Sequence, residues 1–376
     1  MRRPPLTAAV LVLLALLLTI PVPPAGAVFG GTAADADTNP AMAAVLLGDG
    51  GVCGGSLVSA TKVVTAAHCV TTTAGVARGD VSVALGEINL DQIGPEDVTN
   101  VSAVHVHPDY VPETFTADVA VLTLATPSSL APVRLVTPAE GDLWGAGSVG
   151  TVTGWGETGS GTPPNRLQVG VVSIPGDAAC QGMWDTQQFV CAGDATVETC
   201  AGDSGGPLMV ADRSGAKVLV GVLVVGDGTC GDGIPDAFAR VGSDPLNLWL
   251  RAQLDSRSPK VTGQTPTGTG VSRGASVVAT FSEKMSPASI NSSTFVLSRL
   301  KPDGAHKISD VTIALGADGL SAKLNPFGGS AGRLARDARY QVLVTTAARD
   351  LGGNRLDQDR KTAGLQRKEW TFRTTR

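Results

Sequence analysis

The positions of the six cysteines are the sequence feature that most restricts how this chain can fold. All six lie between Cys53 and Cys230, and the last third of the chain has none. Cysteines of an exported chain usually pair, since the compartment is oxidising. At 376 residues the chain also exceeds the size at which one hydrophobic core keeps growing. The clustering therefore predicts a first domain stapled by disulfides and a second domain without them, and spacing alone leaves many pairings open.

The first 27 residues have the order of a secretory signal peptide. Arg2 and Arg3 precede an apolar run from Leu6 to Ile20, and Ala25-Gly26-Ala27 supplies a small-residue cleavage site. The apolar run is short for a membrane span, which needs about 20 residues. We therefore predict a signal peptide over 1–27 and a secreted, extracellular mature protein. An uncleaved anchor is the alternative.

Composition favours an all-β fold, because 47 Gly and 23 Pro accompany many Val, Thr and Ser residues. One helix stands out at DPLNLWLRAQL, where Asp244 is a candidate N-cap and Pro245 a candidate first helical residue. It would close the first domain at about Leu254. The stretch from Asp255 to Gly274 is rich in Ser, Thr, Pro and Gly, and we interpret it as a linker or a loop-rich domain edge.

Charge divides at the same place. From Val28 to Asp255 there are 8 Lys and Arg against 25 Asp and Glu, a balance of −17. From Ser256 to Arg376 there are 19 against 9, a balance of +10. The two parts therefore have opposite electrostatic character, which the average over the whole chain conceals.

Three segments carry the residues that nucleophilic catalysis by serine requires: a hydroxyl, an imidazole that takes its proton and a carboxylate that orients the imidazole. VVTAAHCV contains His68, FTADVAVLTL contains Asp118 and CAGDSGGPL contains Ser204. Alone, each residue has a structural reading, as a core histidine, a strand-end cap or a turn residue. Together, and in this order, the segments resemble the defining motifs of the chymotrypsin/trypsin family.

The resemblance extends from Val28 to about Leu254. It implies a two-barrel fold and a serine endopeptidase in which Ser204 attacks, His68 transfers the proton and Asp118 orients His68. The backbone N–H groups of Gly202 and Ser204 would form the oxyanion hole. It also implies the disulfides Cys53–Cys69, Cys180–Cys191 and Cys200–Cys230.

Activation and specificity follow from the same resemblance. Family members become active when a new N-terminal amine pairs with the aspartate before the serine, here Asp203. VFGG resembles the family's mature N-terminus, so cleavage after Ala27 would free the amine of Val28 and make export the activating step.

The base of the specificity pocket would be Glu198, six positions before Ser204, and Asp236 could point into the same pocket. Two carboxylates favour Arg or Lys before the cleaved bond. The pocket edge reads Val224-Val225-Gly226 where the family commonly has Ser-Trp-Gly, so the serine that usually supports the catalytic aspartate is replaced by Val224. The remaining substrate-binding position is Gly226.

The loop Leu85–Asp97 resembles the family's calcium-binding stretch, with oxygen donors at Glu87, Asn89, Glu96 and Asp97. The register of the donors differs from the family pattern, so we favour a solvated acidic loop over a structural calcium site. We expect no cofactor.

Beyond Asp255 the sequence alternates β-rich segments with turn signals, as in a β-sandwich. VVATFSEKM and the D-x-x-G-N segment at Asp350 resemble bacterial immunoglobulin-like domains. Residues 255–376 are therefore interpreted as a linker and an Ig-like domain, whose basic surplus suits an anionic cell-wall polymer; a spacer is the alternative. No motif suggests nucleic-acid binding, and we expect a monomer. The competing function is an inactive protease-fold binding protein tethered to an anionic surface.

Overall fold

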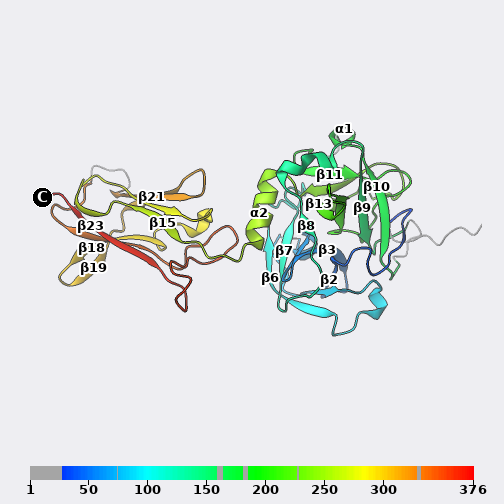
Figure 1. Ribbon diagram of the computed structural model, residues 1–376, viewed down its shortest axis with the longest axis horizontal. Coiled ribbons are helices and arrows are strands. Elements are labelled where there is room, and N and C mark those ends of the chain that lie inside the picture. The colour runs from blue at the N-terminus through cyan, green and yellow to red at the C-terminus, as the bar shows by residue number, and fades with distance from the viewer. Residues whose placement is uncertain (1–27, 74, 159–163, 181–184, 227, 328–331) are drawn as a thin grey trace, which may run out of the picture.

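A computed structural model describes residues 28–73, 75–158, 164–180, 185–226, 228–327 and 332–376. The predicted signal peptide over 1–27 lies outside the described residues. Two β-rich units follow one another along the chain and lie end to end, with helix α2 (Asp244–Leu254) at the junction (Figure 1). Their hydrophobic cores are separate. The predicted all-β class is confirmed.

The first half of the N-terminal unit is a closed barrel of six antiparallel strands. Its strands are rich in Val, Ala and Leu, and their inward side chains, among them Val45, Leu57 and Leu122, are fully buried. This core is what holds the ends of β4 and β7 in place. The strands, in barrel order, are β2 (Met42–Leu47), β3 (Val52–Ser59), β4 (Lys62–Thr65), β7 (Ala120–Leu124), β6 (Val98–Val106) and β5 (Val81–Leu85).

The second half is an eight-stranded sheet that packs on the barrel through a shared core. The long strand β13 reads KVLVGVLVV and is almost wholly buried, as a continuous apolar strand should be. The order is β1 (Thr32–Ala33), β10 (Gln168–Ile174), β9 (Ser148–Gly154), β12 (Pro207–Ala211), β13 (Lys217–Val225), β14 (Asp236–Arg240) and β11 (Phe189–Ala192), with β8 (Arg134–Leu135) beside β13.

Helix α2 closes this unit, as predicted, but its N-cap is Ser243 rather than Asp244. Asp244 is instead the first helical residue, where a carboxylate interacts favourably with the positive end of the helix dipole. The other helical segments are short: α1 (Asp177–Cys180) and the 3₁₀ turns η1 (His68–Val70), η2 (Leu90–Gln92), η3 (Pro138–Trp144) and η4 (Pro287–Ser289).

The C-terminal unit is the predicted β-sandwich, and its two sheets enclose Tyr340, Phe295 and Leu324. One sheet has the order β15 (Val261–Thr265), β17 (Val277–Phe281), β21 (Ser321–Pro326) and β20 (Val311–Leu315). The other has the order β16 (Gly268–Val271), β23 (Lys368–Thr374), β22 (Arg339–Val344), β18 (Phe295–Lys301) and β19 (Gly304–Lys307).

The stretch interpreted as a linker is shorter than the composition suggested. Its Thr and Gly residues form β15 and β16, and only 255–260 lies between α2 and the first strand of the sandwich. These strands are polar because they lie near the surface, where burial does not demand apolar side chains.

The D-x-x-G-N loop of the sandwich contacts the end of α2. Asn354 Nδ2 donates to the carbonyl oxygen of Asp255 at 2.7 Å, and Gln253 Nε2 donates to that of Leu351 at 2.9 Å. Asn354 also donates to the carboxylate of Asp350. The loop motif therefore joins the two units as well as shaping its own turn.

Two predicted disulfides are confirmed, Cys53–Cys69 and Cys200–Cys230. Cys191 is also disulfide-bonded, but the side chain of Cys180 lies outside the described residues, so that pairing stays a prediction. In the part of the chain that the structure describes, no helix has the length and apolarity needed to cross a membrane.

Candidate active site

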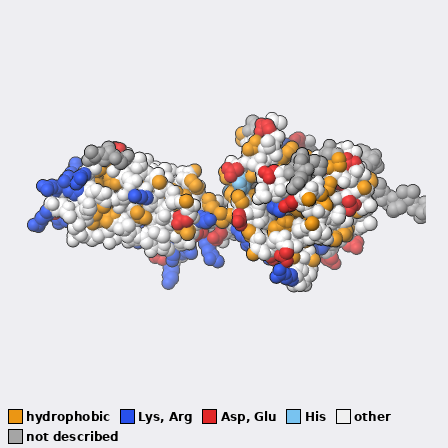
Figure 2. Space-filling model, turned by 90° about the horizontal axis from the view of Figure 1, so that it is seen from above, with side chains coloured by type: hydrophobic (Ala, Val, Ile, Leu, Met, Phe, Trp, Pro, Cys, Tyr) orange, Lys and Arg blue, Asp and Glu red, His pale blue; other side chains and the backbone are white. Residues whose placement is uncertain are grey.

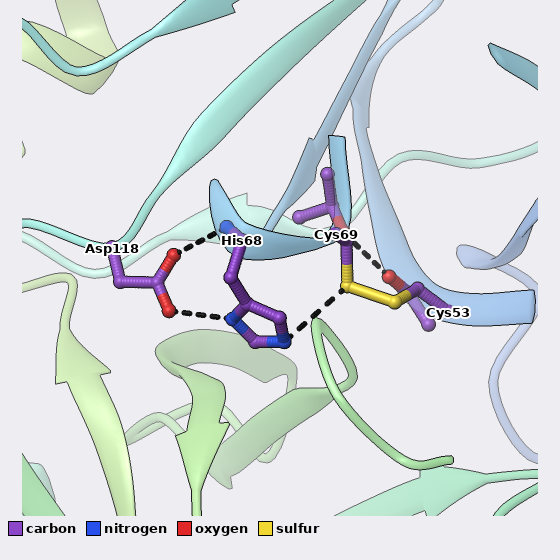
Figure 3. Close-up of a disulfide and its surroundings, with 6 residues drawn as sticks. Cys53, His68, Cys69 and Asp118 are labelled. Atoms are coloured by element: carbon purple, nitrogen blue, oxygen red, sulfur yellow. Dashed lines mark hydrogen bonds and ion pairs between the residues drawn. A yellow bond between two sulfur atoms is a disulfide. The ribbon is translucent and has the colours of Figure 1, made fainter. Parts of the chain in front are cut away.

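His68 and Asp118 lie at the ends of neighbouring barrel strands. His68 opens the turn that follows β4, and Asp118 comes two residues before β7, which pairs with β4. Asp118 Oδ2 lies 2.6 Å from His68 Nδ1, and Oδ1 accepts the backbone N–H of His68 at 2.8 Å (Figure 3). Asp118 is fully buried. The carboxylate therefore fixes both the ring and the backbone of the histidine.

Ser204 belongs to the other half of the unit, in the glycine-rich turn before β12. Its carbonyl oxygen accepts the N–H of Gly54 on β3 at 2.7 Å. Gly205 has φ +77°, and a Cβ there would lie 2.4 Å from both Gly54 O and Thr65 Oγ1. Only glycine permits this approach. The serine turn is thus pressed against the barrel just before His68.

The disulfide Cys53–Cys69 strengthens this arrangement. Cys69 follows His68, and Cys53 precedes Gly54, which holds the serine turn. The Sγ atom of Cys69 lies 3.7 Å from His68 Nε2 (Figure 3). Among the described residues, Cys53, His68 and Cys69 are the one group with metal-ligand proximity. Both cysteines are oxidised to the disulfide, and a thiolate is what a metal would bind, so these residues do not fit a metal ion.

The turn around Ser204 leaves some of its backbone N–H groups without an acceptor among the described residues. Those of Asp203, Gly205 and Gly206 donate to the carbonyls of Cys200, Leu223 and Asp203. Those of Gly202 and Ser204, the two residues predicted for the oxyanion hole, have no acceptor among the described residues. Gly202 has φ +96°, a conformation that suits glycine.

A pocket of about 200 Å³ lies beside Ser204, and among its described lining residues Asp236 is the one with an acidic side chain. The carboxylate of Asp236 accepts the N–H of Thr199 at 3.0 Å and also the Thr199 hydroxyl. A Cβ on Gly226 would lie 2.2 Å from Asp236 Oδ1, so the glycine leaves space for the acid. Burial raises the pKa of Asp236 to about 7, and the charges of Glu198 and Asp203 add to the increase. The described lining residues are Thr199, Cys200, Ala201, Ser204, Leu223, Val224, Val225, Gly226, Gly228, Thr229, Cys230 and Asp236.

Glu198 is buried but does not line this pocket. Its carboxylate accepts the N–H of Gly231 at 2.6 Å, and its own N–H donates to the carbonyl of Phe29 at 3.1 Å. The structure therefore differs from the prediction that Glu198 forms the pocket base. The extra methylene of glutamate carries the carboxylate past the pocket to the backbone of the Cys230 loop.

The substitution of Val224 for serine leaves the orientation of Asp118 intact. Val224 is buried and lines the pocket, and the two bonds of Asp118 to His68 hold the carboxylate. Val224 and Gly226 stay at the pocket edge, where both were predicted.

Val28 and Asp203 are both buried. A Cβ on Gly170 would lie 2.8 Å from Val28 Cγ1, and one on Gly154 would lie 2.0 Å from Asp203 Oδ1. Gly170 pairs with Val152 on β9, two residues before Gly154, so both contacts lie on one face of this strand pair. Burial raises the pKa of Asp203 to about 7, although backbone N–H groups of Cys200 and Gly156 oppose the increase.

Two site residues were missed by sequence reasoning. Thr199 holds the pocket carboxylate, and Phe29 lies against Gly231, where a Cβ would come within 2.4 Å of the phenyl ring. Thr199 directly follows Glu198, the residue expected at the base of the pocket, and this position in the sequence could have identified it. Nothing local in the sequence indicates the contact between Phe29 and Gly231.

Two of the four oxygen donors predicted for the acidic loop form hydrogen bonds within the loop itself. Asn89 Oδ1 accepts the N–H of Asp91 and caps η2, and Asp97 Oδ2 accepts the N–H of Gly94. These bonds hold the local turns of the loop.

Comparison with known proteins gives two family matches. A family model described as trypsin matches residues 28–250, and one described as a bacterial Ig-like domain matches residues 255–374. A trypsin of Saccharopolyspora erythraea is 36% identical over 224 residues, which cover 57% of this chain and 94% of that protein. A trypsin-like protease of Streptomyces glaucescens is 32% identical over 224 residues, 57% of this chain and 79% of that protein. The homology supports a serine protease, and the chain belongs to the trypsin family, with a bacterial Ig-like domain after its protease domain.

Proposed function

We propose that this protein is a secreted serine endopeptidase that cleaves peptide bonds through an acyl-enzyme intermediate. The observation that carries the proposal is the buried Asp118, which orients His68 at the point where the Ser204 turn meets the barrel. With Nδ1 bonded to Asp118, His68 offers Nε2 to the Ser204 hydroxyl. His68 then takes the serine proton during attack on the carbonyl and returns it to the leaving amine.

The backbone N–H groups of Gly202 and Ser204 are positioned by the same turn to stabilise the oxyanion. Their availability supports this role, since donors that are already bonded elsewhere could not respond to the developing charge. A panel of short Arg, Lys, Leu and Phe ester and amide substrates tests the proposed activity, with the Ser204→Ala protein as control. Inactivity on all four would favour the inactive binding protein instead.

Asp236 supports a preference for Arg or Lys before the cleaved bond. Its carboxylate is the acid of the pocket, and a charge-assisted contact with a substrate cation is strong where water is excluded. We assign the base of the pocket to Asp236, and Glu198 supports its wall.

Export and activation are linked in this proposal. Cleavage after Ala27 would free the amine of Val28 to pair with the buried Asp203, which has no cation among its described hydrogen-bond partners. The amine would supply the missing charge, and the paired disulfides suit the oxidising compartment outside the cell.

We expect Asp203→Asn to lower kcat/KM about 10²-fold or more in the mature enzyme, because removing one partner of a buried ion pair costs about 3 to 5 kcal/mol. A chain that keeps one extra residue before Val28 should lose activity to a similar extent, since its amine is displaced. N-terminal sequencing of the secreted protein should find Val28 first. Full activity of the extended chain would contradict this mechanism.

Self-cleavage should occur after Arg257, in the short segment between the domains. Arg257 is exposed and lies outside any strand, whereas the backbone of Arg273 is hydrogen-bonded to Leu334. Intact-mass analysis during incubation should show two fragments that meet at 257/258. The Ser204→Ala protein should stay whole, and cleavage of both proteins would point to a contaminant.

The Ig-like domain would hold the enzyme at an anionic cell-wall polymer. The balance of +10 after residue 255, against −17 before it, supports this role and argues against the protease domain as the anchor.

A further inference from the structure

The far end of the Ig-like domain carries a concentration of arginine side chains. Lys and Arg gather at the end away from the protease domain, where Figure 1 places the C-terminus (Figure 2). All but one of these side chains are exposed, and Arg273 is half-buried. We call this set the arginine tip, and it consists of Arg273, Arg333, Arg336, Arg339, Arg373 and Arg376.

Backbone hydrogen bonds bring the segments of the arginine tip together. Leu334 N–H donates to the carbonyl of Arg273, Asp337 N–H donates to Thr375, and Thr375 N–H donates to Val271, each at 2.9 Å. Residues 271–273, 332–339 and 373–376 therefore meet at one end of the sandwich. The arginines are displayed on a fixed scaffold.

The arginine tip contains an unfavourable charge arrangement. Arg339 on β22 lies directly opposite Arg373 on β23, with both side chains on the exposed face of the sheet. Like charges in such a pair are destabilising. Asp337 pairs with Arg373 at 2.9 Å and approaches Arg376 at 4.0 Å, and one carboxylate cannot neutralise six guanidinium groups. The tip keeps a surplus of positive charge at a cost in stability.

The end of the same domain near α2 is different. There, Arg360 lies 3.7 Å from Glu283, and Arg367 lies 3.4 Å from Glu369. Asp350 is also on that side, in the loop that contacts α2. Two arginines near the protease domain thus each have an acidic partner, whereas one carboxylate serves the six arginines of the tip.

We propose that the arginine tip binds a linear phosphodiester polymer at the cell surface and anchors the enzyme by the end farthest from its protease domain. This inference deepens the proposed anchoring role of the Ig-like domain and is independent of the catalytic assignment. All six cations are arginines, whose planar forks bind phosphate oxygens in pairs, whereas lysine offers only a point charge. A chain with repeated phosphates can engage several forks at once.

A membrane surface fits the arginine tip less well than a polymer. Interfacial binding combines basic side chains with apolar ones that enter the bilayer. None of the large apolar side chains exposed in the described part of the chain belongs to the tip segments. The tip therefore offers charge and hydrogen-bond donors, which a hydrated polymer can satisfy.

The test measures binding of the full chain, carrying Ser204→Ala to prevent self-cleavage, to beads coated with poly(glycerol phosphate) over a range of salt concentrations. Arg336→Glu with Arg339→Glu should weaken binding about tenfold or more at low salt. It should also flatten the plot of log affinity against log salt by about 1.5, since each phosphate contact contributes about 0.7 to 0.9. Neither side chain has a hydrogen bond or ion pair among the described residues, so the fold should persist.

The matched control is Lys260→Glu with Lys361→Glu, which makes the same change of charge near the junction and should bind like the parent. Equal weakening of both variants, or of neither, would overturn the proposal. Binding to anionic phospholipid vesicles but not to the polymer would overturn it as well. The same substitutions in the Ser204 enzyme should leave hydrolysis of short substrates unchanged, so a failure of the anchor is distinguishable from a failure of the peptidase.

Discussion

Replacing Ser204 with alanine is expected to lower kcat about 10⁴- to 10⁶-fold on any substrate that the enzyme cleaves. The hydroxyl is the proposed nucleophile, and without it only oxyanion stabilisation and binding remain to accelerate the reaction. His68→Ala should cause a loss of similar size, because the two residues act as one unit. The double variant should be little worse than either single variant. Steady-state kinetics at known protein concentrations would measure all three.

The controls separate a chemical effect from a structural one. Ser204→Ala should keep the thermal unfolding midpoint of the parent, since Ser204 contacts the barrel through its backbone carbonyl rather than its hydroxyl. A peptide aldehyde inhibitor should form a hemiacetal with the Ser204 hydroxyl of the parent enzyme. It should form none with the alanine variant, which lacks that hydroxyl. If Ser204→Ala retained more than about a tenth of the activity, another nucleophile would be responsible and the proposed catalytic residues would be wrong.

Asp236→Asn is expected to lower kcat/KM for Arg substrates about 10²- to 10³-fold while changing Leu substrates far less. The amide keeps the shape of the pocket and removes the charge that pairs with the substrate guanidinium. Without the carboxylate, the substrate guanidinium would be buried in the pocket with no opposite charge, and the cost of an unpaired buried charge accounts for an effect of this size. Kinetics on matched Arg and Leu substrates would measure it.

Glu198→Gln is the matched comparison for that experiment. Its side-chain oxygen can still accept the N–H of Gly231, so we expect a change of at most about fivefold. If Glu198→Gln abolished the preference for Arg and Asp236→Asn preserved it, Glu198 would be the base of the pocket after all.

The pocket should also respond to pH. Burial raises the pKa of Asp236 to about 7, so its charge is lost as the pH falls through that value. The ratio of kcat/KM for Arg over Leu substrates should therefore rise with pH across neutrality. The ratio cancels any pH effect on the catalytic step that both substrates share. In Asp236→Asn the ratio should be flat, and a slope that survives the substitution would assign the effect to another group.

Local motifs carried much of the prediction. The segments around His68, Asp118 and Ser204 identified the family, because their residue types are dictated by chemistry and by close turns. The disulfides Cys53–Cys69 and Cys200–Cys230 followed from the resemblance. The β-sandwich was visible in alternating strands such as β22 and β23, whose inward side chains must be apolar.

Other features depended on contacts between distant residues. The linker was overestimated because strands β15 and β16 are polar, and polar edge strands look like loops in composition. Ser243 occupies the N-cap position of α2 in place of Asp244, a shift of one residue that propensity cannot resolve. The contact of Asn354 with Asp255 joins residues far apart in the chain, and no local sequence pattern predicts it.

The amino-acid sequence by itself determined the family, the all-β class, the division near residue 255 and the residues of the proposed reaction, since each depends on local chemistry or composition. Only the tertiary structure decided which of the two predicted acids lines the pocket beside Ser204 and where the basic surplus gathers. Glu198 and Asp236 are both acids in suitable segments, and what separates them is the direction of each side chain. One is held by Gly231 and the other by Thr199. Similarly, six arginines from three segments become one surface because strand pairing brings 271–273, 332–339 and 373–376 to the same end of the sandwich.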